Sequence, residues 1–230
     1  MASPEKRAAG RRAADYVESG QRVGLGTGST VFFTLERLAE RIHEDGLEMV
    51  GVPTSIDTEK KATELGIPLS TLDEIEALDV TIDGADEIDG AFQMIKGGGG
   101  ALLREKVVAS ASSAMIAVVG ANKVVDRLGT TFDLPVEVVP FARAAVARRI
   151  RALGGVPGLR GGPETPYRTD NGNEILDVHF ARGIDDAARL ELDLDAIPGV
   201  VESGLFIGLC QRVVIGDPSG EAEVRERDGA

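Results

Sequence analysis

The sequence predicts an α/β fold: a doubly wound, mostly parallel sheet with a second, smaller α+β domain. In the first half, short apolar runs alternate with amphipathic stretches of helical length, and glycine or acidic turns follow the runs. After Asp126 the pattern changes to prolines, arginines and closely spaced strands. Alternating strands and helices favour parallel pairing with right-handed crossovers, so the first domain is expected to be Rossmann-like.

The composition is that of a globular chain. Its 230 residues are 43% hydrophobic, enough to bury a core in one sizeable domain or two small ones. The single cysteine, Cys210, excludes an internal disulfide framework, and its apolar neighbours predict a core position. No apolar run reaches membrane-spanning length and the N-terminus lacks an apolar signal region, so we expect a cytoplasmic protein without a membrane partner.

The charge balance is strongly acidic. The formal net charge is −13, which argues against nucleic acid as a partner because phosphate binding needs a basic surface. Only six of the 25 basic residues are lysines. Acid excess with few lysines is expected in a high-salt cytoplasm, where screening weakens self-repulsion. An ordinary acidic surface is the alternative, and both remain open.

The first domain is predicted over residues 1–129 plus 205–230. Helical periodicity begins at Glu5 and stops before Gly20, and it resumes after the glycine turn at 26–28. Ser55 or Asp57 can cap a further helix that reaches Leu65. The expected helices are 5–19, 31–43, 55–65 and 101–112, and the expected strands are 23–26, 49–52, 67–69, 80–82, 116–119 and, returning from the second domain, 206–215.

The second domain is predicted over residues 130–204. Its expected order is strand–helix–strand–strand–helix–strand, the split βαβ or ferredoxin-like arrangement. Thr169–Asn173 is a strong turn signal. The segments that carry the prediction are strand 134–140, helix 141–153, a glycine and proline loop at 154–166, strand 174–179, helix 185–194 and strand 200–204. The last ten residues, rich in glutamate, are expected to form a loose tail.

The stretch Gly24–Thr30 has the sequence GLGTGST between a strand and a helix. It fails the dinucleotide fingerprint because Ser29 stands at the third glycine position, and it lacks the lysine of a P-loop. Thr27, Gly28, Ser29 and Thr30 still offer backbone N–H groups and three hydroxyls at a helix start, which suits one phosphate or a sugar oxygen. A tight turn before a capped helix is the alternative.

Four carboxylates lie within seven residues at Asp83, Asp86, Glu87 and Asp89, directly after the strand 80–82. They repel one another unless something cationic is held there, so a bare solvated turn is a weak explanation. Their spacing does not fit an EF-hand loop. His43 is expected on the surface and His179 in a structural role, so we expect no transition-metal site.

Lys96 precedes four glycines, which allow a ligand close to the backbone. Glu105 stands early in the next predicted helix, where its carboxylate could face back over the glycine loop; an ordinary surface charge is the alternative. Lys123 follows the strand 116–119. The stretches 27–30, 83–89 and 96–100 all follow predicted strands, so they could share the carboxyl edge of the sheet, where ligands of such folds bind.

The motifs GLGTGST at 24–30, DGADEID at 83–89 and KGGGGALLREK at 96–106 together resemble those of type A ribose-5-phosphate isomerases. The resemblance continues through LPVEVVPFARAAVARRI at 134–150, TDNGNEILDVHF at 169–180 and IPGVVESGLF at 197–206, and so covers nearly the whole chain. The chain departs from the family pattern in its acidic surface, in the segment 161–166 and in the tail, none of which touches these motifs.

The resemblance implies interconversion of D-ribose 5-phosphate and D-ribulose 5-phosphate in the pentose phosphate pathway, without metal or other cofactor. It implies a dimer or tetramer. By motif match Glu105 would be the proton-transferring base, with Asp83, Asp86 and Lys96 as catalytic neighbours. The residues implied to bind substrate are Thr27, Gly28, Ser29, Thr30, Asp83, Gly84, Ala85, Asp86, Lys96, Gly97, Gly98, Gly99 and Lys123.

Two other functions are compatible with parts of this pattern. An aminosugar-phosphate deaminase or CoA transferase could share the sheet, but a deaminase should offer a catalytic histidine, and neither His43 nor His179 adjoins a motif. A regulator that senses sugar phosphates would need a DNA-binding domain, whereas here the first predicted helix leads almost directly into the sheet. The expected ligand is therefore a small sugar phosphate.

Overall fold

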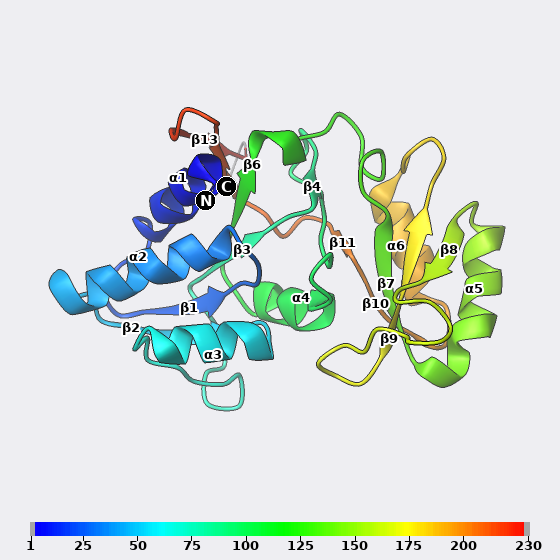
Figure 1. Ribbon diagram of the computed structural model, residues 1–230, viewed down its shortest axis with the longest axis horizontal. Helices are drawn as coiled ribbons and strands as arrows, with labels where there is room; N and C mark the ends of the chain where they lie inside the picture. Colours follow the sequence, from blue (N-terminus) through cyan, green and yellow to red (C-terminus); the bar gives the residue numbers. More distant parts are fainter. Residues whose placement is uncertain (1–2, 228–230) are drawn as a thin grey trace. The chain divides into compact units, whose positions relative to one another are not determined.

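The chain folds into two compact units, and the computed structural model describes residues 3–227 (Figure 1). The first unit combines the chain up to Ala85 with Arg104–Val124 and the chain from Leu209 onward. The second unit combines Asp86–Leu103 with Val125–Gly208, more than the segment 130–204. Whether 130–204 folds as a domain of its own stays a prediction.

The first unit is built on a six-stranded sheet in the order β13-β12-β6-β3-β1-β2, which confirms the predicted mostly parallel sheet. Every neighbouring pair is parallel except the β12–β13 pair. Helices cover both faces of a doubly wound sheet, so its strands are buried and rich in apolar side chains. The strands are β1 (Gln21–Leu25), β2 (Met49–Pro53), β3 (Val80–Gly84), β6 (Met115–Gly120), β12 (Arg212–Gly216) and β13 (Ala222–Glu226).

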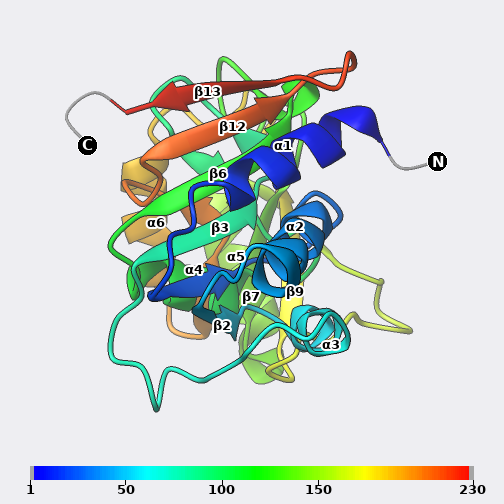
Figure 2. The same cartoon turned by 90° about the vertical axis from the view of Figure 1, so that its left-hand side faces the viewer.

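Four helices accompany this sheet: α1 (Pro4–Ala14), α2 (Val31–Glu44), α3 (Ile56–Glu64) and α4 (Leu102–Ser110). Successive residues of a strand point to opposite faces. Val23 and Leu25 pack in the core that α1 and α2 share, whereas Gly24 faces Val108 of α4. Figure 2 shows α1 and α2 crossing the near face of the sheet, with α4 behind it. No helix within residues 3–227 has the length and apolar character needed to cross a membrane.

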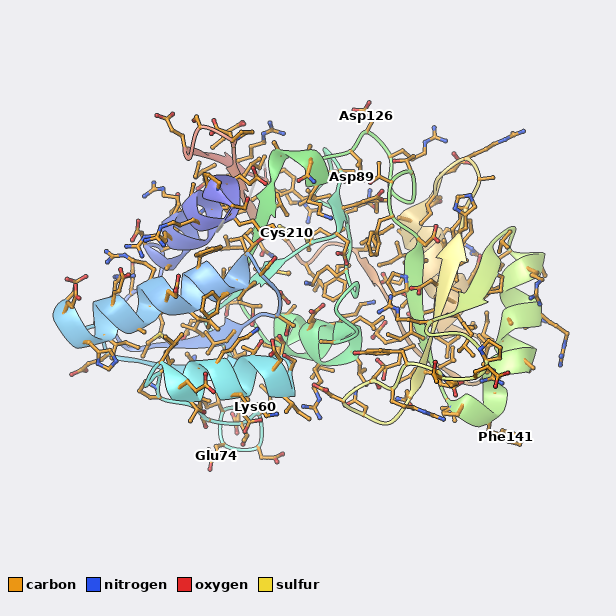
Figure 3. All side chains as sticks on the ribbon, in the orientation of Figure 1. Lys60, Glu74, Asp89, Asp126, Phe141 and Cys210 are labelled. Carbon is orange, nitrogen blue, oxygen red and sulfur yellow. The ribbon has the colours of Figure 1, made fainter. Side chains whose placement is uncertain are left out.

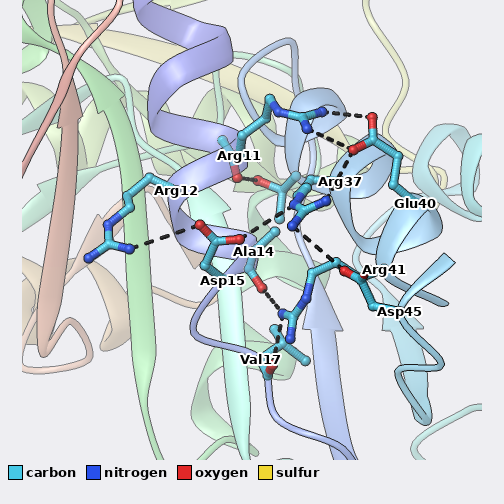
Figure 4. Close-up of polar contacts among 11 residues, drawn as sticks. Arg11, Arg12, Ala14, Asp15, Val17, Arg37, Glu40, Arg41 and Asp45 are labelled. Carbon is cyan, nitrogen blue, oxygen red and sulfur yellow. Dashed lines mark hydrogen bonds and ion pairs between the residues drawn. The ribbon is translucent and has the colours of Figure 1, made fainter.

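A network of ion pairs links α1 to α2 (Figure 4). Arg11 Nη1 and Nη2 each donate to one oxygen of the Glu40 carboxylate at 2.7 Å, and Arg37 contacts Asp15, Glu40 and Asp45. The hydrogen bond from Arg11 is the main cause that lowers the pKa of Glu40 to about 2. Arg11 and Arg37 therefore each form ion pairs with carboxylates.

The second unit holds an antiparallel sheet in the order β10-β7-β9-β8. With its two helices this sheet has the predicted split βαβ arrangement. Alternate residues of β7 (Leu134, Val136 and Val138) face a core shared with α5 and α6. The elements are β7 (Leu134–Val138), the 3₁₀ turn η2 (Pro140–Ala142), α5 (Arg143–Ala152), β8 (Val156–Leu159), β9 (Glu174–His179), α6 (Ala187–Asp195) and β10 (Val200–Ser203).

A small three-stranded sheet, β11-β5-β4, completes the second unit. It consists of β4 (Glu87–Ile88), β5 (Met94–Ile95) and β11 (Leu205–Phe206). Lys96–Gly100 therefore follows a strand of this sheet and not of the parallel sheet, so the expectation that all three polar stretches follow strands of one sheet is wrong.

Three further predictions need correction. Ala222–Glu226 is not a loose tail but pairs with β12; residues 228–230 lie outside the described part. The predicted loop at 154–166 contains β8, which its Pro and Gly concealed. The predicted strand 67–69 makes only an isolated bridge from Leu69 to Gly51. Cys210 is fully buried, as predicted, whereas Phe141 is fully exposed (Figure 3).

Candidate active site

In the first unit, the predicted site residues stand at the carboxyl ends of three neighbouring parallel strands. Thr27 follows β1, Asp83 lies near the end of β3, and Lys123 ends the 3₁₀ turn η1 (Ala121–Lys123) that follows β6. Parallel strands end at the same edge of a sheet. The sequence-based prediction that Thr27 and Lys123 follow strands of the parallel sheet is confirmed, whereas Asp83 lies within β3, which extends to Gly84.

Asp83 is fully buried and tied to the glycine turn. Its Oδ1 atom accepts hydrogen bonds from the Thr27 N–H at 3.0 Å and from its neighbour, the Gly84 N–H, at 2.7 Å. Gly26 makes this approach possible: a Cβ there would lie 2.3 Å from the Asp83 Cγ. The second glycine of GLGTGST is therefore required by the packing of a buried carboxylate.

The Thr27 hydroxyl belongs to a cluster that sequence reasoning missed. Its Oγ1 lies 2.8 Å from Thr54 Oγ1, 2.8 Å from Ser55 Oγ and 3.1 Å from Thr58 Oγ1. Ser55 also caps α3, as predicted, by accepting the Thr58 N–H at 3.0 Å. The sequence offers Ser55 as a helix cap, but no local pattern shows that the hydroxyls of Ser55 and Thr58 meet residue 27. This cluster fixes the start of the loop.

The rest of the loop, Gly28–Thr30, precedes α2 and receives a positive charge from α1. Lys6 Nζ donates to Ser29 Oγ at 3.0 Å. Gly10 lets α1 approach closely, because a Cβ at that position would lie 2.5 Å from the Thr30 carbonyl oxygen. A helix N-terminus beside an ammonium group is suited to bind a phosphate.

Backbone N–H groups bind three carboxylates of the acid-rich turn. Asp86 Oδ2 accepts the Gly98 N–H at 2.7 Å. Glu87, fully buried, accepts four hydrogen bonds from the loop 129–132. Asp89 Oδ1 accepts the N–H groups of residues 91 and 93, both at 2.9 Å. Amide donors offset the mutual repulsion of the carboxylates.

Lys96 and Glu105 are both buried, with relative exposures of 2% and 4%. The Lys96 Nζ lies 5.3 Å from the centre of the Phe206 ring, a cation–π contact within the second unit. Glu105 stands in the first turn of α4, where the helix dipole favours a negative charge. The alternative that Glu105 is an ordinary surface charge is therefore wrong, since buried charges are rare away from functional or paired sites.

The predicted site residues are divided between the two units. The first unit contributes Thr27–Thr30, Asp83–Ala85, Glu105 and Lys123, and the second contributes Asp86 and Lys96–Gly99. Thr27 meets Asp83 in the first unit, and Asp86 meets Gly98 in the second.

Both histidines have local partners. His43 is exposed, with Nε2 3.1 Å from the Leu65 carbonyl oxygen, and His179, also exposed, pairs with Asp133 at 2.9 Å. Within the described residues, no group of three or more His, Cys, Asp or Glu side chains is arranged to hold a metal ion.

Comparison with known proteins places these motifs in a family. The family model of ribose 5-phosphate isomerase A (phosphoriboisomerase A) matches residues 50–220. The ribose-5-phosphate isomerase A of Ruegeria pomeroyi is 50% identical, over 95% of this chain and 85% of that protein. The protein of the same name from Thermosynechococcus vestitus is 48% identical, over 96% of this chain and 95% of its own length.

Two solved structures support the same family. Ribose 5-phosphate isomerase A of Methanocaldococcus jannaschii superposes with a TM-score of 0.92 at 37% identity, covering 98% of this chain and 100% of that one. A D-ribose-5-phosphate isomerase in complex with phospho-erythronic acid has a TM-score of 0.93 at 35% identity, covering 99% and 100%. This chain belongs to the ribose 5-phosphate isomerase A family.

Proposed function

We propose that this protein is a ribose-5-phosphate isomerase, which interconverts D-ribose 5-phosphate and D-ribulose 5-phosphate without a metal in the non-oxidative pentose phosphate pathway. The observation that carries the proposal is the loop Thr27–Thr30. Its Ser29 hydroxyl accepts a hydrogen bond from the Lys6 ammonium, and its Thr27 N–H donates to the buried Asp83, both at 3.0 Å. One loop thus joins a cation suited to a phosphate with a carboxylate suited to sugar hydroxyls.

The phosphate is assigned to the N-terminus of α2. Gly28, Ser29 and Thr30 supply N–H groups and hydroxyls there, and Gly28 has a φ of 118°, which favours glycine. Lys6 adds a positive charge at Ser29, and Lys123 is the second lysine assigned to substrate binding. Most of the affinity for the substrate is expected to come from these contacts with its phosphate.

The chemistry requires a proton to move between C1 and C2 through an enediolate. Glu105 removes the proton from one carbon and returns it to the next, as one carboxylate can do for adjacent carbons. Negative charge that develops on the substrate oxygen is stabilised by Lys96 and by the glycine loop that follows it. Asp83 and Asp86 orient the sugar hydroxyls and help transfer the proton between O1 and O2; ring opening is assigned to one of these two aspartates.

The assay for this proposal follows conversion of ribose 5-phosphate to ribulose 5-phosphate with a chelator present. We expect full activity under these conditions. No turnover, or turnover that the chelator removes, would contradict the proposal.

The role of Glu105 is tested with Glu105→Gln, which keeps the shape of the side chain but cannot accept the proton. A general base contributes about 10²–10⁴-fold, so kcat should fall by at least that factor while KM changes little. Glu59→Gln is a matched control, because Glu59 also stands in the first turn of a helix, α3, but is exposed. Substantial residual kcat in Glu105→Gln would remove Glu105 from the base role.

The remaining assignments are a cytoplasmic location, a homodimer or homotetramer, and no nucleic-acid partner. The support is the net charge of −13 and the family resemblance. Sedimentation of the purified protein would measure the oligomeric state, and a monomer would contradict this part of the proposal.

A further inference from the structure

The glycine loop Gly97–Gly100 is a tight turn, which the Gly100 N–H closes by donating to the Gly97 carbonyl at 2.9 Å. Gly97 and Gly100 have φ values of 105° and 84°, in the region that favours glycine. Gly98 is glycine for a different reason, since a Cβ there would lie 2.7 Å from Asp86 Oδ1. The turn is thus shaped by its own backbone and by Asp86.

Arg160, from outside the turn, holds two of its carbonyl groups. Its Nη1 lies 2.9 Å from the Gly97 oxygen and 3.2 Å from the Gly98 oxygen. Its other edge binds the Asp177 carboxylate, with Nε 3.0 Å from Oδ2 and Nη2 2.5 Å from Oδ1. A planar guanidinium held on two edges has little freedom to move. The Arg160 side chain is only 16% exposed.

The third carbonyl of the turn is held by Tyr167, whose hydroxyl lies 3.2 Å from the Gly99 oxygen. The Tyr167 ring lies 5.7 Å from the Arg160 guanidinium carbon, and the Tyr167 N–H donates to the Arg160 carbonyl at 2.9 Å. The segment after Tyr167 is held by the buried Glu137, whose carboxylate accepts hydrogen bonds from the Thr169 hydroxyl at 2.9 Å and from the Asn173 amide at 2.8 Å. The two anchors therefore rest on the antiparallel sheet.

Holding the carbonyls fixes where the N–H groups point, because C=O and N–H are opposed across a planar trans peptide. The peptide between Gly97 and Gly98 has its oxygen on Arg160 and its N–H on Asp86 at 2.7 Å. The next peptide also has its oxygen on Arg160, so the N–H of Gly99 points away from the guanidinium. Gly99 is exposed, and no group within residues 3–227 accepts its N–H.

We propose that Arg160 is a positioning residue of the isomerisation. By holding the carbonyls of Gly97 and Gly98, it directs the Gly99 N–H toward the charge that develops on the substrate oxygen. It also maintains the hydrogen bond between the Gly98 N–H and Asp86. This inference rests on the proposed function. Preorganised N–H donors act mainly on the transition state, so losing Arg160 should reduce kcat more than it raises KM.

The test compares Arg160→Ala with Arg160→Lys in the ribose 5-phosphate assay. A misplacement of about 1 Å near the reacting atoms can reduce the rate about 10²-fold, so we expect that loss in kcat for Arg160→Ala with KM little changed. Arg160→Lys should restore little, because one ammonium cannot bind two carbonyls and both carboxylate oxygens together. A cavity of about 460 Å³ lined by Gly98, Thr131, Phe132, Asp133, Arg160 and Asp177 offers space beside the truncated side chain. Guanidinium ion at a sub-denaturing concentration should therefore raise the kcat of Arg160→Ala.

The control is Arg143→Ala, which removes another arginine–carboxylate contact of the same unit: Arg143 lies 3.0 Å from Glu174, which is 2% exposed. Its kcat should stay at the wild-type value even if its melting temperature falls. The inference is overturned if folded Arg160→Ala keeps its kcat, if Arg143→Ala loses as much, or if guanidinium leaves Arg160→Ala unchanged. A wild-type protein without isomerase activity would instead refute the proposed function, so the two failures are distinguishable.

Discussion

Gly26→Ala is predicted to misplace Asp83 and thereby slow the reaction. The added Cβ would lie 2.3 Å from both Cγ and Oδ1 of Asp83 and 2.6 Å from its Cα, whereas ordinary contacts begin at 3.4 Å. Asp83 would have to move by about 1 Å, and a shift of that size at a substrate-orienting group can reduce the rate about 10²-fold. Overpacking of this kind also destabilises a protein by about 1–3 kcal/mol.

The assay measures kcat and KM for ribose 5-phosphate together with the urea midpoint. The matched control is Gly155→Ala, whose Cβ would lie 2.4 Å from Val178 Cγ1 and 3.1 Å from Ile150 Cγ2 in the core of the second unit. Both variants should lose stability, but only Gly26→Ala should lose kcat. If Gly26→Ala is folded and as active as the wild type, or if Gly155→Ala loses the same kcat, the assigned link between Gly26 and Asp83 is wrong.

Three further predictions concern charged groups. Lys6→Met should raise KM for ribose 5-phosphate several-fold with a smaller change in kcat, because the ammonium at Ser29 is assigned to the non-reacting phosphate; an unchanged KM in steady-state kinetics would contradict that. Glu87→Gln should lower the free energy of unfolding by about 1.5–3 kcal/mol at pH 7 in urea titrations, because an amide nitrogen would face a backbone N–H donor; an equal urea midpoint would argue against it. Glu40→Gln should be less stable than the wild type above pH 4.5, and the two should converge as pH falls toward 2, because Arg11 lowers the pKa of folded Glu40 from 4.5 to about 2. That difference should be at most about 1 kcal/mol, since the Glu40 side chain is 37% exposed, and a gap that persists at pH 2 would contradict it.

Most strand and helix positions in both units were predictable from local pattern. Apolar runs such as Met115–Gly120, with every residue buried, have the composition of a covered parallel strand. The elements that were missed have weak local signals. Val156–Leu159 contains Pro and Gly, and its pairing with β9 makes it a strand. Ala222–Glu226 is polar because it is an edge strand, so only its pairing with β12 distinguishes it from a tail.

The candidate site was predicted as a set of motifs but not as a set of contacts. The residue pattern indicated Thr27–Thr30 as a possible anion loop, because a glycine turn between a strand and a helix offers backbone N–H groups. The family resemblance, not the local pattern, indicated Glu105 as the base. The sequence could not reveal that Glu105 is 4% exposed, because a glutamate in a first helical turn has the same local pattern whether it is buried or exposed. It also could not reveal that backbone N–H groups bind the carboxylates of Asp86 and Glu87.

By itself, the sequence determined the fold class, most of the helices and strands, and the family, because periodicity, turn residues and motif order are properties of neighbours along the chain. The tertiary structure decided which groups meet. Lys6 reaches Ser29 across 23 positions, Thr27 reaches Asp83 across 56, and Arg160 reaches the carbonyls of Gly97 and Gly98 across more than 60. Contacts at such separations depend on how helices and sheets pack, and local propensity carries no record of that packing.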